Sequence, residues 1–341
     1  MRARRSSATL LCARRALLAE RAYDPGRLTA GGFQVSTLSS FSSEFDPSSE
    51  LPVSSEHDER EGPSSRDSRR IQALVRLLGD TDEKILKVAW EELERSGVQA
   101  LAFLRQAQRE SPDERVRVQS RRFLLEWRRR EVFRDWVQFC KGDRRDLERG
   151  AFIIARTENP DCDVETYRAT LDDYASTLRY RLRPSAEIDE TIGNIGDFLF
   201  REIGFRGDST NYNGVENSYL NRVIDRKAGI PITLSAIFLL VCRRLSLSVH
   251  GVGMPRHFLL KYRNETREYF IDAFHGGRVL SVHDCARFLS SIGVPFRDDY
   301  LQAVSDQAIL SRMLNNLFRS YWGAKDERRA NRVAAMQKLL G

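Results

Sequence analysis

The sequence predicts an α+β fold that is mostly helical, with a small antiparallel sheet packed on a buried helix. Three observations predict it. Amphipathic helical periodicity begins near residue 67, an almost wholly apolar helix follows Pro231, and three short alternating segments come directly after that helix. The first helices also predict a helical-repeat-like region ahead of the α+β core.

The first segment, 1–66, has the composition of a disordered tail or linker. Residues 1–27 hold seven arginines against Glu20 and Asp24, and no apolar run there has the length of a secretory signal. The following stretch is rich in serine and acidic residues. Such a composition buries too little apolar surface to offset the loss of chain entropy.

The segment 67–140 reads as short amphipathic helices joined by polar turns. Leu74, Leu77 and Leu78 fall on one helical face, and the turns LGDTD and RESPDE separate the helices. Helices of this length resemble HEAT-type repeats, although only about two units are visible. A plain helical bundle explains the same pattern equally well, and both interpretations stay open.

The most apolar helix of the chain is expected after Gly229-Ile230-Pro231. Glycine ends the preceding helix, and proline suits the first position of the next one. Apolar residues then recur at helical spacing and predict burial: Leu234, Ile237, Phe238, Val241 and Leu245.

Three strands are expected next, at Val249–Met254, His257–Arg263 and Glu268–Ala273. A hairpin of the last two strands, centred between residues 264 and 265, places His257 directly opposite Asp272. Opposed residues have Cβ atoms about 4.5–5.5 Å apart, so an imidazole and a carboxylate could form a hydrogen bond there. Such a pair is either a structural contact or a general base with its orienting acid.

A family resemblance begins at these elements. The runs NSYLNRVIDRKAGIPITLSAIFLLVCRRLSLSVHGVGMPRHFLLKY and EYFIDAFHGGRVLSVHDC resemble the core of the SirB1 family of transglutaminase-like proteins. The resemblance covers about 143–341. It implies a transglutaminase/papain-like core over 143–295, and a C-terminal helical hairpin over 296–341 that resembles the start of a tetratricopeptide-like region.

The resemblance also implies a catalytic cysteine at the start of the buried helix, followed by a histidine and an aspartate on the strands. His257 and Asp272 match the histidine and the aspartate and are the candidate remnant dyad. The cysteine position falls in Gly229-Ile230-Pro231, which has no thiol. Thr233 is the remaining candidate nucleophile, because Cys242 lies about three turns along the helix, roughly 16 Å from Pro231.

Three further residues are candidates for the lining of a cleft at this site. Asn217 lies in the NSYL motif, Pro231 starts the buried helix, and His275 follows Asp272 in a Gly-rich turn. A turn hydrogen bond for Asn217 and an exposed turn position for His275 are the structural alternatives. No metal site is predicted, since His250 and His283 lack ligand partners at a useful spacing, and no cofactor is predicted.

Composition limits the partners and the compartment. Five scattered cysteines without a paired spacing favour reduced thiols and a cytoplasmic location, and no apolar run has membrane-spanning length. Residues 115–134 hold eight arginines, but no nucleic-acid motif accompanies them, so nucleic acid is not the expected partner. The oligomeric state is left open.

Two functions are the main alternatives, and a nucleic-acid contact through the arginines of residues 115–134, which would need a steep salt dependence of binding, is a third. The first is a non-catalytic protein-binding or scaffold module, which follows from the missing cysteine and the flanking helices. The second is a hydrolase or amidase in which the His257–Asp272 pair acts on water or on Thr233. The sequence therefore does not decide whether the protein is an enzyme.

Overall fold

The computed structural model describes residues 64–142, 146–183 and 186–341. The described residues form two compact units, and the boundary between the units falls within one helix, between Trp127 and Arg128.

The predicted disordered segment 1–66 lies outside the described residues apart from its last three. Ser65 and Arg66 already belong to the first described helix. The helix starts there because the Ser64 side chain accepts a hydrogen bond from the backbone N–H of Asp67.

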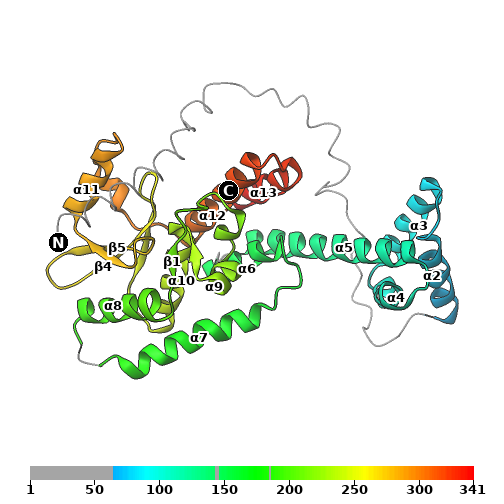
Figure 1. Ribbon diagram of the computed structural model, residues 1–341, viewed down its shortest axis with the longest axis horizontal. Coiled ribbons are helices and arrows are strands. Elements are labelled where there is room, and N and C mark those ends of the chain that lie inside the picture. The colour runs from blue at the N-terminus through cyan, green and yellow to red at the C-terminus, as the bar shows by residue number, and fades with distance from the viewer. Residues whose placement is uncertain (1–63, 143–145, 184–185) are drawn as a thin grey trace. The chain divides into compact units, whose positions relative to one another are not determined.

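Among its described residues, the N-terminal unit contains the helices α2 (Ser65–Leu77), α3 (Glu83–Arg95), α4 (Val98–Glu110) and the first half of α5 (Glu114–Lys141) (Figure 1). Its own apolar core includes Ile71, Leu78, Leu93, Leu104 and Phe123. The HEAT-like character of these helices stays a prediction, as do the domain boundaries drawn from the sequence.

The larger unit is built around α10 (Pro231–Arg244), in which every residue from Pro231 to Cys242 is buried. After α5, the helices of this unit that precede α10 are α6 (Leu147–Arg156), α7 (Val164–Arg181), α8 (Ile188–Gly196), the π-helix η2 (Asp197–Glu202), the 3-10 helix η3 (Val215–Ser218) and α9 (Leu220–Arg226). Helix α10 contacts α7 and α9 and also the strands β3 and β4. The predicted buried helix is confirmed, and it starts at the predicted proline.

The sheet has four antiparallel strands in the order β3 (His250–Val252), β4 (Leu259–Arg263), β5 (Glu268–Asp272) and β6 (Arg278–Leu280). The fourth strand was not expected from the sequence. A separate parallel pair joins β1 (Arg206–Gly207) to β2 (Ala228–Gly229), just before α10. Together with the helices, this sheet confirms the predicted α+β class.

The last part of the chain contains α11 (Val282–Ser291), the 3-10 helix η4 (Asp298–Leu301), α12 (Asp306–Gly323) and α13 (Glu327–Leu340). Helices α12 and α13 pack on each other as a hairpin (Figure 1). The hairpin is tied to the rest of the unit, because the indole N–H of Trp136 donates to the carbonyl oxygen of Met336. In the described ranges, no helix is both long enough and apolar enough to span a bilayer.

Candidate functional site

The β4–β5 hairpin determines where the acid of the candidate dyad lies. Leu260 faces Ile271, so the pairing is displaced by two positions from the predicted register, which was wrong. The turn is the cause: the side chain of Asn264 accepts from the backbone N–H groups of Thr266 and Arg267 and moves the turn centre toward them. Asp272 therefore does not stand directly opposite His257.

His257 nevertheless reaches Asp272, from the loop that precedes β4. A displacement by two positions keeps side chains on the same face of a sheet, whereas a displacement by one would have separated them. The loop is held from α12, because the guanidinium of Arg312 donates to the carbonyl oxygens of Met254 and His257, each at 2.8 Å. Arg312 is 55 residues away in sequence, and nothing in the sequence pattern indicated its role.

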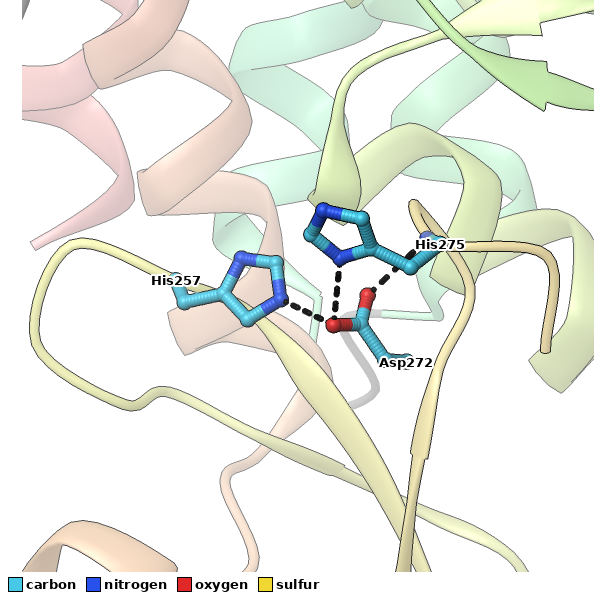
Figure 2. Close-up of side chains that lie close together, drawn as sticks. All are labelled: His257, Asp272 and His275. Carbon is cyan, nitrogen blue, oxygen red and sulfur yellow. Dashed lines mark hydrogen bonds and ion pairs between the residues drawn. The ribbon is translucent and has the colours of Figure 1, made fainter. Parts of the chain in front are cut away.

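The carboxylate of Asp272 lies between two imidazoles (Figure 2). Its Oδ2 is 3.0 Å from Nε2 of His257 and 2.7 Å from Nδ1 of His275. Its Oδ1 accepts a hydrogen bond of 3.2 Å from the backbone N–H of His275. The structure therefore brings together three of the predicted site residues, and the contact between Asp272 and His275 was not anticipated.

The contact between His257 and Asp272 has the distance of an ion pair but not the direction of a hydrogen bond. Nε2 of His257 is a buried atom that has no hydrogen-bond partner among the described residues. The ring is close to two others, with centroids 5.5 Å from Phe288 and 6.0 Å from His275. Only 8% of the His257 side chain is exposed, against 46% of the His275 side chain.

The electrostatics of the cluster favour an ionised aspartate. Burial alone would raise the pKa of Asp272, but the two imidazoles beside it hold this pKa well below its usual value. The hydrogen bond to Asp272 raises the pKa of His275, and partial burial opposes that rise. The cluster thus keeps a negative charge between two imidazoles in a place with little solvent.

The turn that carries His275 rests on β1. A Cβ atom on Gly207 would lie 2.6 Å from the carbonyl oxygen of Phe274 and 2.7 Å from two carbons of its ring. The ring of Phe274 also packs edge-on against Tyr212, with centroids 5.8 Å apart. Phe274 and Gly207 therefore fix the turn between Asp272 and His275.

The start of α10 has no thiol, and its two hydroxyls, those of Thr233 and Ser235, are fully buried. Pro231 is buried at the first turn of the helix, as predicted from its position. The Thr233 hydroxyl is completely buried, and it lies at hydrogen-bond distance from the carbonyl oxygens of Asn217 (2.7 Å) and Ile230 (3.1 Å). A hydroxyl that already donates its proton to a backbone carbonyl has no route to a base.

Two buried thiols, Cys242 in α10 and Cys285 in α11, have raised pKa values. Burial raises the pKa of Cys242, which lies inside α10 and is not exposed at all. Burial, together with the charges of Asp284 and Asp272, raises the pKa of Cys285 to about 12. Since the thiolate is the reactive form, neither residue is an activated nucleophile at neutral pH.

Asn217 has a structural place in the fold. Its side chain is fully buried, donates to the carbonyl oxygen of Asn211 at 2.6 Å and accepts from Arg226 at 3.0 Å. Its backbone carbonyl also accepts the Thr233 hydroxyl. These contacts correspond to the turn hydrogen bond that was the structural alternative for this residue, and its assignment to a cleft stays a prediction.

One set of atoms at the site has the chemistry of metal ligands. Nitrogen atoms of His257 and His275 and an oxygen of Asp272 all lie within 4.8 Å of one another. No metal site was expected from the sequence, where His250 and His283 lack ligand partners at a useful spacing. The fold alone makes them neighbours.

Comparison with known proteins places the matched region over these same elements. The profile of the transglutaminase-like superfamily matches residues 165–315. A UPF0162 protein of Xylella fastidiosa (strain 9a5c) is 32% identical over 190 residues, covering 54% of this chain and 68% of that protein. A UPF0162 protein of Vibrio cholerae is 24% identical over 176 residues, covering 50% of this chain and 65% of that protein.

A eukaryotic relative shares a shorter region. F-box only protein 21 of Homo sapiens is 32% identical over 127 residues, which are 35% of this chain and 20% of that protein. No solved structure matches the chain. The region matched by the superfamily profile therefore includes the buried helix and the sheet. The relatives' names do not state a chemistry for the site.

Proposed function

Because the chain belongs to the UPF0162 family, within the transglutaminase-like superfamily, we propose that it is a non-catalytic member that binds other proteins. The observation that carries the proposal is the start of α10. Where the superfamily resemblance implies a thiol, the chain has Ile230 and Pro231. Of the two hydroxyls nearby, that of Thr233 is bound to backbone carbonyls, and that of Ser235 is fully buried. Acyl transfer through a covalent enzyme intermediate needs such a nucleophile.

The N-terminal helices support the binding role. A cavity of about 450 Å³ lies between the end of α2 and the start of α5. Its lining combines apolar, acidic and basic groups: Leu78, Asp80, Thr81, Glu114, Arg115, Val118 and Gln119. Val118 is 56% exposed, and Oε1 of Gln119 is buried without a hydrogen-bond partner in the described ranges. An exposed apolar side chain in a cavity that also has acidic and basic groups suits the surface of a polypeptide.

Substitution of Val118 tests the binding role. Full-length protein is used as bait for crosslinking and mass spectrometry. We expect Val118→Glu to reduce capture of a specific partner by about tenfold or more. The loss of one central apolar contact changes binding affinity on that scale. Val282→Glu is the matched control. Val282 is similarly exposed but lies in the first turn of α11, where a carboxylate is favourable. Equal capture by all three proteins would contradict the assignment of this surface.

A second candidate function is favoured by one observation, the 3.0 Å approach of His257 to Asp272. In that case Nδ1 of His257, the ring nitrogen turned away from Asp272, would take a proton from water. The resulting hydroxide would attack an amide or ester carbonyl, and the amine or alcohol would leave with that proton. General base catalysis alone contributes roughly 10²–10⁴-fold.

A hydrolysis assay separates the two functions. We expect a fluorogenic peptide-amide library to be turned over no faster by the wild-type protein than by Asp272→Asn, because no covalent nucleophile is available. Turnover that Asp272→Asn abolishes would establish the hydrolase instead. Thr233→Val then identifies the attacking group: water is the nucleophile if the rate is kept, and the threonine is implicated if the rate is lost while the far-ultraviolet circular dichroism is unchanged.

A further inference from the structure

The cluster at the end of β5 has a geometric property that a catalytic dyad does not need. Three atoms that could bind a metal ion come together from three backbone positions: the loop before β4, the last residue of β5 and the turn that follows it (Figure 2). The oxygen Oδ2 of Asp272 is 2.7 Å from one ring nitrogen and 3.0 Å from the other. Two ligands bound side by side to one metal ion, at about 2.1 Å each, are separated by about 3.0–3.4 Å.

The buried nitrogen of His257 is the second observation. His257 is 8% exposed, its Nε2 faces Asp272, and this atom has no hydrogen-bond partner within residues 64–142, 146–183 and 186–341. Leaving a buried polar atom without a partner is unfavourable, because the atom has lost its hydrogen bonds to water. Hydrogen bonding within the cluster satisfies His275 and Asp272 but leaves this nitrogen unsatisfied, whereas a cation held between the three side chains would satisfy all of them.

We propose that Nε2 of His257, Oδ2 of Asp272 and Nδ1 of His275 bind one divalent transition-metal ion, of which Zn²⁺ is the best match. Two imidazoles and one carboxylate suit Zn²⁺ and its neighbours in the first transition series, and they do not suit Ca²⁺ or Mg²⁺, which prefer oxygen ligands. Zn²⁺ tolerates the low ligand number that three side chains and one or two waters provide.

The surroundings fit such a site. The backbone N–H of His275 holds Oδ1 of Asp272, and Arg312 holds the carbonyl of His257, so two of the ligands are oriented by further hydrogen bonds. The side chain of His275 is 46% exposed, which leaves one side of the cluster open for entry of the ion and for water. Metal binding is independent of the proposed protein-binding function, because it is measured without any partner or substrate.

Direct titration tests the site. Full-length protein is freed of metal with a chelator and then titrated with Zn²⁺ in competition with a chromophoric chelator. We expect one ion per chain, and we expect His275→Ala to weaken its binding by at least about 100-fold, since even an outer-shell partner of a metal ligand is worth 10–100-fold. His283→Ala is the matched control: this histidine is also exposed but lies on α11, outside the cluster, and its loss should leave the affinity unchanged.

The visible spectrum of the Co²⁺-substituted protein identifies the ligands. Nitrogen and oxygen ligands give d–d bands without a thiolate charge-transfer band, and these bands should disappear in His275→Ala. A strong thiolate band would mean that cysteines hold the ion and would overturn the proposal. Equal affinity of wild-type protein and His275→Ala, or no binding at all, would overturn it as well.

Discussion

The substitution Asp272→Asn is expected to lower the free energy of unfolding by about 3 kcal/mol at pH 6 in the presence of a chelator. The carboxylate is buried, at 6% exposure, and it is within 3.0 Å of two imidazoles. Removing its charge leaves His275 without the acceptor that raises its pKa. Urea unfolding of the full chain measures the change.

The pH dependence of this difference follows from the direction of each pKa shift. The pKa of Asp272 is lower in the folded state, so its contribution is present above the unfolded value near 3.9 and is lost as the pH falls. The pKa of His275 is raised, so its contribution is present below about 6.5 and is lost as the pH rises through the folded value. The gap between wild type and Asp272→Asn should therefore be widest near pH 5–6.

Asp299→Asn is the control for this prediction. Asp299 is also paired, with Arg297, but its side chain is 76% exposed, and exposed pairs contribute about 0–1 kcal/mol. A loss of stability in Asp272→Asn that is no larger than in this control would mean that the buried carboxylate is not paired in solution.

The substitution Gly207→Val is expected to destabilise the larger unit by about 3 kcal/mol through overpacking. The reason is space rather than backbone conformation, because Gly207 is not among the glycines with positive φ. Its added Cβ would lie 2.6 Å from a backbone oxygen of Phe274, which cannot rotate away as a side chain can. Phe274 precedes His275, so the displaced turn should also break the 2.7 Å contact between His275 and Asp272.

Two measurements check this prediction. The unfolding midpoint reports the destabilisation, and the side-chain NMR signals of His275 report the displaced turn. Gly193→Ala is the matched control, because nothing lies within 4 Å of an added Cβ there and Gly193 is inside α8. It should raise stability by about 0.5–1 kcal/mol. An unperturbed His275 in Gly207→Val would show that β1 does not fix the turn.

The buried helix and the fold class could be predicted because each depends on local sequence. Pro231 starts α10 as its ring geometry requires, and the apolar run after it has helical spacing. Helix starts are harder to predict. Ser111 and Asp113 in the turn RESPDE are both residue types that cap helices; Ser111 ends α4, and Asp113 accepts the backbone N–H of Arg115 at the start of α5. When two capping residues are close in sequence, packing rather than propensity selects between them.

The site was only partly predictable for a similar reason. The sequence indicated His257 and Asp272 through an assumed register, and the contact survived because the register error was an even number of residues. A local signal for His275 was present, since an aspartate side chain commonly accepts a nearby backbone N–H in a turn. Arg312 and Phe288 gave no such signal, because their roles depend on the packing of distant helices.

The hydrogen bonds from Arg312 to Met254 and His257 make the geometry of the histidine loop depend on a helix that is synthesised later. This arginine lies in α12, which follows the sheet in sequence and is joined to earlier elements through Asp306, which accepts from the backbone N–H of Leu147 and from Arg243. A polypeptide leaves the ribosome with its N-terminal part first. The histidine loop can therefore acquire its final geometry only after α12, which follows the sheet in sequence, has been synthesised.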